Sequence, residues 1–292
     1  MLQWAMAIPF ALVALVGWGV GDVFITIASR KIGNGLTTFW WLTFNLILSL
    51  LYLPFAPPIT NWGMVALALV MGLVGVVSVL WYFRALEIGN ASLVGTIAGS
   101  FAMITVPLSV ILFGEQLVPQ QIVGIILILF GLVMATLKKE AIKEIKTGKV
   151  FSDPGVGLAL VVMLIWGVYW TLIRIPVETL GWYWAGIPTY FYFMLLPIIG
   201  VVKGNLLQPL RKKGALPTLI IATLLTLWGN YSFNIGITYG YSSLVAPVAG
   251  ASPVLFVILS RFVFRDKLTT QQKVGIVATL SGIILIAFSS SS

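Results

Sequence analysis

The sequence predicts an all-α membrane protein with ten transmembrane helices that form two inverted five-helix repeats. Three observations lead to this prediction: the apolar composition, ten long apolar runs, and the similarity between the two halves of the chain. Of the 292 residues, 60% are hydrophobic and 9% are charged, and the mean hydropathy is +1.07. A chain of this composition has too little polar surface to coat a soluble globule, so much of its surface must face lipid.

Ten apolar runs are long enough to be membrane-spanning helices, because a bilayer core of about 30 Å requires roughly 20 residues at about 1.5 Å each. They lie near residues 7–28, 36–53, 62–85, 91–112, 120–137, 155–175, 182–202, 215–236, 243–263 and 270–288. Short connections join them, except for a polar stretch at 138–154 that divides the chain almost in half. We therefore expect a first repeat at residues 1–137, a linker at 138–154 and a second repeat at 155–292.

The two halves of the chain are similar to each other. With an offset of 151, residues 89–131 align without a gap with residues 240–282, and 18 of these 43 positions are identical. Several identities fall on small or polar residues, such as Gly99 with Gly250, which shared apolar composition does not explain. Because five is an odd number, the second repeat enters the membrane from the opposite side to the first. Inverted repeats of this kind are common in secondary transporters.

The residue types that are missing exclude most catalytic sites. The chain has no histidine and no cysteine, and the phosphate-binding pattern GxxxxGK[ST] does not occur. Histidine-based triads, cysteine nucleophiles and imidazole or thiolate metal sites are therefore excluded. Seven of the eight acidic residues fall in loops or at the ends of the predicted helices. We expect no enzymatic activity and no cofactor, and any uphill work must draw on a gradient or a partner.

The distribution of basic residues predicts the orientation in the membrane. Of the 17 Lys and Arg residues, 16 fall on one side when the ten spans are threaded, and Arg174 is the exception. Because basic residues near membrane spans are retained in the cytoplasm, we expect the linker 138–154 in the cytoplasm and both termini outside the cell membrane. This topology accounts for the net charge of +9, so a nucleic-acid partner is not expected.

Two charged residues within the predicted spans are candidates for a role in transport, Asp22 and Arg174. Asp22 lies about 7 Å from the middle of an otherwise apolar helix, where an acid costs about 2.5–3.5 kcal/mol to insert. It could couple transport to protons or anchor a substrate ammonium group; alternatively, it bonds to a neighbouring helix or extends toward Arg30. Arg174, on the mirrored helix, could clamp a substrate carboxylate, or it could pair with Glu178 one turn later.

Other acidic residues lie at helix ends. Glu115 and Asp266 occupy equivalent ends of the fourth and ninth predicted helices, where a cap or a loop tether is the favoured interpretation and a gate is the alternative. Arg84 and Glu87 lie one turn apart and are expected to neutralise each other.

Aromatic and amide side chains within the spans are the candidate substrate-binding residues, since indole N–H and phenol O–H groups require partners that lipid does not offer. The alternative is that these residues anchor the lipid interface or hold helices together. An amphipathic, partly aromatic or cationic ligand would suit such a lining through stacking and cation–π contacts. The candidates are Trp18, Tyr82, Trp166, Tyr169, Trp170, Asn230, Tyr231 and Asn234.

Two motifs carry a resemblance to a known family. One is Trp18-Gly19, repeated as Trp166-Gly167, and the other is the junction Phe113-Gly114-Glu115-Gln116-Leu117 with its echo Phe264-Arg265-Asp266-Lys267-Leu268. With these motifs the chain resembles the drug/metabolite transporter superfamily, and specifically two tandem EamA-type domains. The resemblance implies a five-plus-five helix fold and transport of a small molecule, which among relatives ranges over amino acids, sugars, nucleotide conjugates and drugs.

The residues and the resemblance together predict a secondary transporter that works by alternating access. We expect it to move a small metabolite, an amino acid or a similar amphipathic compound, in the direction of export. The alternatives are uptake of a sugar or translocation of a lipid-linked carrier on the same fold, and a membrane subunit without transport activity. The expected partners are a small-molecule substrate, the lipid bilayer and protons, with the protein acting as a monomer or a homodimer.

Overall fold

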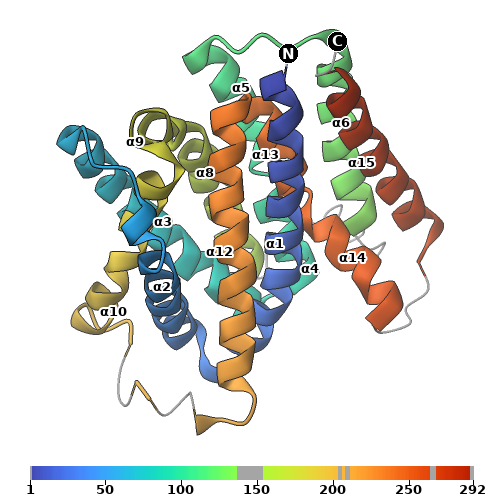
Figure 1. Cartoon of the computed structure of the whole chain (residues 1–292). Coiled ribbons are helices and arrows are strands. Elements are labelled where there is room, and N and C mark those ends of the chain that lie inside the picture. Colours follow the sequence, from blue (N-terminus) through green and yellow to red (C-terminus); the bar gives the residue numbers. More distant parts are fainter. Residues whose placement is uncertain (1, 137–153, 203–205, 208–210, 264–267, 290–292) are drawn as a thin grey trace.

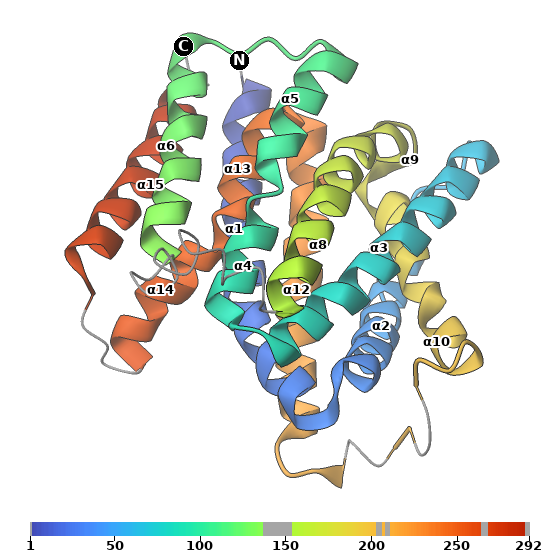
Figure 2. The same cartoon turned by 180° about the vertical axis from the view of Figure 1, so that it is seen from behind.

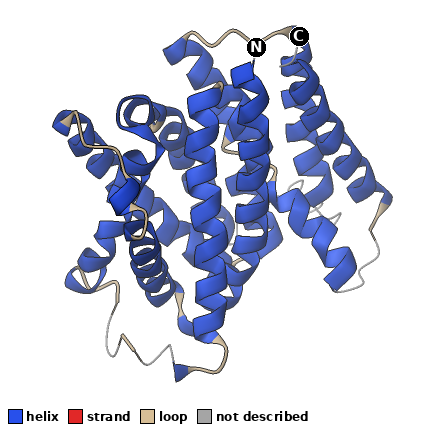
Figure 3. Cartoon of the chain, in the orientation of Figure 1, coloured by secondary structure: helices blue, strands red, loops and turns tan. Residues whose placement is uncertain are grey.

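A computed structural model describes residues 2–136, 154–202, 206–207, 211–263 and 268–289, and the linker predicted at 138–154 lies almost wholly outside them. Within this part of the chain the regular elements are helices (Figure 3). They are α1 (Leu2–Ile32), α2 (Asn34–Leu50), η1 (Leu53–Phe55), α3 (Trp62–Ile88), α4 (Ala91–Gly99), α5 (Ala102–Phe113), α6 (Pro119–Thr136), α8 (Pro154–Leu172), α9 (Arg174–Gly186), η3 (Ile187–Met194), α10 (Leu195–Ile198), α12 (Ala215–Tyr239), α13 (Ser242–Gly250), α14 (Ser252–Val263) and α15 (Thr270–Ser289).

Eight helical segments in the described residues are long and apolar enough to cross a membrane. They are Met6–Ile32, Trp62–Ile88, Leu93–Phe113, Pro119–Thr136, Pro154–Leu172, Ala215–Tyr239, Ser242–Leu259 and Thr270–Ser289. The all-helical membrane class predicted from composition is therefore confirmed, and each of these segments coincides with one of the ten predicted spans.

The second and seventh predicted spans are not among these eight segments. The second corresponds to α2, which has 17 residues, and the seventh to the end of α9 followed by η3 and α10. The seventh span follows a kink in α9 at Gly181, which takes a left-handed conformation (φ +81°), and within the span the prolines at 188 and 197 cannot donate a helical hydrogen bond. A continuous helix at 182–202 is thus a wrong prediction, and ten crossings remain a prediction.

The fourth and ninth predicted helices are both interrupted, and two of the three prolines within them are not at the breaks. Pro107 and Pro247 lie inside α5 and α13. The break between α4 and α5 falls at Ser100, with no proline beside it, whereas the break at Ala251 comes two residues before Pro253. A proline there removes a backbone donor and disfavours a continuous helix through the preceding residues.

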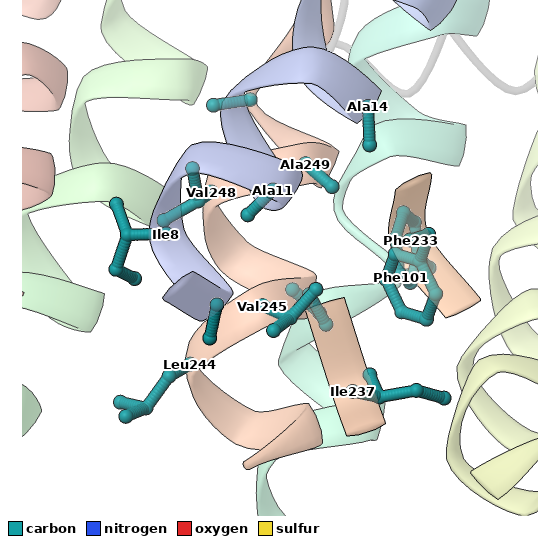
Figure 4. Close-up of a cluster of buried hydrophobic side chains, with 14 of the residues drawn as sticks. Ile8, Ala11, Ala14, Phe101, Phe233, Ile237, Leu244, Val245, Val248 and Ala249 are labelled. Carbon is teal, nitrogen blue, oxygen red and sulfur yellow. The ribbon is translucent and has the colours of Figure 1, made fainter. Parts of the chain in front are cut away.

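Figures 1 and 2 show the helices as one bundle in which α1 and α12 run side by side through the centre. Both termini lie at the same end of the molecule; α1 starts at that end, whereas α8 starts at the opposite end. At this centre, small residues of α1 face α13, as Ala11 and Val248 illustrate in Figure 4, and Phe101 and Phe233 belong to the same cluster of buried residues.

Glycines allow α6 and α15 to pack backbone against backbone at one edge of the bundle. A Cβ atom on Gly131 would lie 2.5 Å from the Gly275 carbonyl oxygen, and one on Gly275 would lie 2.7 Å from that of Gly131. Gly124 and Gly282 form a second pair of the same kind, with corresponding distances of 2.9 and 2.5 Å. Only glycine fits at such distances, so these four positions fix how closely the two helices approach.

The two helix breaks also touch each other. A Cβ atom on Gly99, at the end of α4, would lie 2.7 Å from the Gly250 carbonyl oxygen, and one on Gly250 would lie 2.6 Å from that of Gly99. The breaks therefore meet at the middle of the bundle, next to the aromatic rings described below.

Candidate functional site

A cavity lies between the first and second halves of the chain, with about 950 Å³ of empty space, part of it open to the outside. Glycines and one valine complete a lining that is otherwise aromatic and polar. The aromatic and polar lining residues are Trp18, Asp22, Trp41, Tyr82, Phe83, Phe101, Trp166, Tyr169, Trp170, Thr189, Tyr190, Thr226, Asn230, Tyr231, Asn234 and Ser252. A pocket of largely apolar character with a few placed polar groups is typical of small-molecule sites.

Asp22 is the acidic residue of this lining, and it is held by one neighbouring helix. The Tyr82 hydroxyl of α3 donates a hydrogen bond of 2.6 Å to Asp22 Oδ2. Arg30 does not pair with Asp22, because its Nε and Nη2 donate to the carbonyl oxygens of Leu86 (3.2 Å) and Gly89 (3.1 Å). No ion pair to Asp22 occurs among the residues that the structure describes, so its carboxyl group faces the cavity without a cation.

Tryptophans from both halves form one wall of the cavity, with their N–H groups turned to polar partners. Trp18 Nε1 donates to Asn230 Oδ1 at 2.8 Å, and Trp166 Nε1 donates to the hydroxyl of Ser78 at 2.9 Å. The Trp18 and Trp170 ring centroids are 5.1 Å apart, and those of Trp166 and Tyr82 are 4.7 Å apart. With the donors satisfied, the rings are left to contact a bound molecule by their faces and edges.

Polar groups on α12 complete the lining. Asn230 Nδ2 donates to the Tyr190 hydroxyl at 3.3 Å, and the Tyr231 hydroxyl donates to Ser49 Oγ at 2.8 Å. Asn234, one turn after Asn230, donates to the Trp182 carbonyl oxygen at 3.2 Å, but its own carbonyl oxygen Oδ1 is buried without a partner in the described structure. A buried acceptor of this kind is costly unless a ligand or water supplies a donor.

A second cavity, of about 820 Å³ of empty space, continues from the first toward the end of the bundle where α1 ends. The two share Asp22, Tyr82 and Gly95, and the second extends along α1 past Thr26 to Arg30. The site around Asp22 is therefore connected with the Arg30 end of the molecule.

At the opposite end, a buried ion pair joins the two halves. Glu115, in the loop between α5 and α6, has a fully buried side chain and pairs with Nη1 of Arg174 at the start of α9. Its two carboxylate oxygens also accept hydrogen bonds from the backbone N–H groups of Ser242 (2.9 Å) and Ser243 (3.0 Å), the first residues of α13. Arg174 in addition pairs with Glu178 at 2.5 Å, so it is occupied away from the cavity.

Most of the predicted site residues lie together. Asp22 and all eight predicted substrate-binding residues line the first cavity, whereas Arg174 does not. The Arg174–Glu178 and Arg84–Glu87 pairs are present as the sequence predicted, and Glu115 tethers its loop to the N-terminus of α13. The pairing of Arg174 with Glu115 was not foreseen, and Asp266, the equivalent of Glu115, lies outside the described residues.

Several lining residues were not singled out as site candidates. Trp41 and Tyr190 lie within predicted spans and could have been found as aromatic residues with polar heads, and Trp41 Nε1 indeed donates to the Thr226 hydroxyl at 2.8 Å. Phe101 carries no polar group and lies in an apolar run, so nothing in its sequence context marks it. Among the described residues, no cluster of three or more acidic side chains could hold a metal ion.

Comparisons with known proteins agree with this architecture. A solved crystal structure of a protein superposes with a TM-score of 0.76 at 17% identity, covering 98% of this chain and 97% of the other, which shows a shared fold. An uncharacterised protein of Methanocaldococcus jannaschii is 30% identical over 136 residues, which are 45% of this chain and 96% of that protein. The sequence model of the EamA-like transporter family matches twice, over residues 5–137 and 153–288. The chain is therefore a multi-pass membrane protein of the drug/metabolite transporter superfamily and belongs to its EamA-like transporter family.

Proposed function

We propose that the protein is a secondary transporter that exports a small metabolite, an amino acid or a similar amphipathic compound, by alternating access. The observation that supports this is the cavity at the seam, to which the first half contributes Asp22 and Tyr82 and the second half contributes Trp166, Trp170 and Asn230. A solute held between two halves can be exposed to either side of the membrane when the halves move against each other. Asp22, which can gain and lose a proton, is the proposed coupling group.

The inverted arrangement of ten crossings is part of this proposal, and the glycine contacts support it. The repeat alignment pairs Gly99 with Gly250, and these two residues contact each other through equivalent atoms. The four glycines between α6 and α15 are likewise two aligned pairs that contact crosswise. Reciprocal contacts between equivalent positions are what a two-fold axis in the membrane plane would produce, and the opposite directions of α1 and α8 agree with it (Figure 1).

The two ends of the bundle differ in a way that suits one state of an alternating-access cycle. The Glu115–Arg174 pair closes the end where the termini lie, whereas the second cavity connects Asp22 with the Arg30 end. Near that end, Lys212 Nζ donates to the carbonyl oxygen of Lys31, so basic residues gather there. By the retention of basic residues in the cytoplasm, the proposed state is open to the cytoplasm and the termini are outside.

Efflux from liposomes tests the proposal. The purified protein is reconstituted into vesicles loaded with a mixture of amino acids, organic amines and sugars, a pH gradient is applied, and the released solutes are identified by mass spectrometry. We expect release of one class of solute at a rate that depends on the pH gradient, and Asp22→Asn should abolish this dependence on the pH gradient. Glu87→Gln is the matched control, since Glu87 pairs with Arg84 away from both cavities.

Two results would count against the proposal in different ways. Release no faster than from protein-free vesicles for every solute would overturn the transport function for these compounds. If release is unaffected by Asp22→Asn and by the pH gradient, the protein is a facilitator and its transport is not coupled to protons through Asp22.

A further inference from the structure

The charges around the site are unbalanced. Asp22 is the one carboxylate among the described residues that line the two cavities, and no Lys or Arg side chain lines the first cavity. The basic residue of the second cavity, Arg30, lies about 12 Å farther along α1, and its guanidinium is already bonded to Leu86 and Gly89. A negatively charged group on a substrate would therefore meet Asp22 without a compensating cation.

Helix N-termini in the membrane can hold anionic groups, but two of the backbone N–H groups at these two helix breaks are used within the chain. Met103 N donates to the Ser100 carbonyl oxygen at 2.9 Å, and Val254 N donates to that of Ala251, also at 2.9 Å. The residue before Val254 is a proline and has no N–H group to offer. The N–H groups of Met103 and Val254 therefore do not replace the missing basic side chain.

The groups near Asp22 favour a cation. The Tyr82 hydroxyl is hydrogen-bonded to Asp22, and the Tyr82 ring packs on Trp166. The N–H group of the Trp166 indole donates to Ser78, so the aromatic faces of Tyr82 and Trp166 lie beside the Asp22 carboxylate. An ammonium group is attracted both to a carboxylate and to the face of an aromatic ring. Farther along the cavity, the unpartnered Oδ1 atom of Asn234 is an acceptor, which requires a donor and not a carboxylate.

From this arrangement we infer that the transported compound is an organic amine with a single positive charge and an apolar or aromatic body, and without a carboxylate. The inference rests on the proposed transport function and narrows its substrate from amino acids to amines. The ammonium group binds to Asp22 beside Tyr82 and Trp166, and the body of the compound lies against Trp18 and Trp170.

Four compounds that share a phenyl body and differ in charge test the inference: 2-phenylethylamine, 3-phenylpropan-1-ol, 3-phenylpropionate and phenylalanine. Their binding to the purified protein is measured by calorimetry at neutral pH. We expect the amine to bind about tenfold or more tightly than the alcohol, which brings no charge to Asp22, and than the two carboxylates, whose like charge next to Asp22 disfavours binding. Asp22→Asn keeps an oxygen that accepts the Tyr82 hydrogen bond and removes only the charge.

In Asp22→Asn, we expect amine affinity to fall about 30-fold or more, because one partner of a desolvated charge pair is lost. The affinity of the alcohol should stay within about twofold, and Glu87→Gln should behave like the parent protein. Equal or tighter binding of phenylalanine or 3-phenylpropionate, an unchanged amine preference in Asp22→Asn, or no binding of the amine would each overturn the inference. The transport proposal is judged separately by the efflux assay, since amino-acid or sugar release would support it even if the amine fails.

Discussion

Replacing Glu115 by glutamine should open the end of the molecule where the two termini lie. The substitution keeps the size of the side chain but removes its charge and one of its two acceptor oxygens. Glu115 is the point where the loop between α5 and α6 contacts both α9 and α13, so these contacts must break if the two halves are to separate at this end.

The size of the effect follows from the bonds at this site. Removing one partner of a buried ion pair costs about 3–5 kcal/mol when the remaining charge is left uncompensated. Here Arg174 keeps its pair with Glu178 and is 17% exposed, which lowers the cost. The new amide can also still accept from Ser242 or from Ser243, but not from both. We therefore expect a loss of about 2 kcal/mol, or about 30-fold in the closed-to-open ratio.

A cysteine reporter in the cavity measures this ratio directly, because the chain contains no native cysteine that would react. Ser252→Cys places a thiol in the lining, and a membrane-impermeant maleimide is added to vesicles on the side where the termini are exposed. Glu115→Gln should raise the labelling rate, whereas Glu178→Gln should change it by less than about threefold, since an exposed pair contributes at most about 0.5 kcal/mol.

The reasoning is refuted if labelling of the Ser252→Cys reporter is the same with and without Glu115→Gln. A lower melting temperature without faster labelling would mean that the pair stabilises the folded protein in every state and does not close one end.

Three further results are expected. Gly131→Ala should lower the melting temperature by an amount equivalent to about 1–3 kcal/mol, because the new Cβ would lie 2.5 Å from a carbonyl oxygen of α15. Gly157→Ala is the control and should not lower it, because a Cβ at residue 157 meets open space. Equal effects of the two substitutions in thermal unfolding would contradict the close packing of α6 and α15. In proteoliposomes, Asp22→Asn should stop solute movement driven by a pH gradient alone while leaving movement down the gradient of the solute itself, and retained pH-driven transport would rule out coupling through this carboxyl group. In intact cells, an impermeant maleimide should label Thr60→Cys but label Lys213→Cys only after permeabilisation, and the reverse pattern would invert the proposed orientation.

The sequence was sufficient for the parts of the site that depend on helical spacing. Trp18 and Asp22 lie one turn apart on α1, as Trp166 and Trp170 do on α8, so each pair shares a helix face whatever the rest of the fold does. Once the internal repeat placed the two helices in equivalent positions, their meeting at a common cavity could be predicted. Whether these residues bind a substrate is still a prediction.

Features that depend on contacts between distant segments could not be predicted in this way. Spacing along α9 offers Glu178 as the partner of Arg174, but Glu115 is 59 residues away and becomes a neighbour only through packing. The break at Ser100 has no proline beside it, and its local signal is the Gly99-Ser100 pair alone. Gly99, next to this break, contacts the backbone of Gly250. A contact between two backbones that are far apart in sequence can be seen only in the three-dimensional structure.

The crosswise glycine contacts between α6 and α15 also bear on how such a chain could arise. A match of 136 residues takes up 96% of the archaeal relative, so that protein is about half as long as this one. A half-length chain inserted into the membrane in both directions would bring the same glycine surface from each copy into one symmetric dimer contact. Duplication and fusion of its gene would keep that contact and convert it into an intramolecular one, after which each copy could acquire residues that the other lacks, as Asp22 and Arg174 now illustrate.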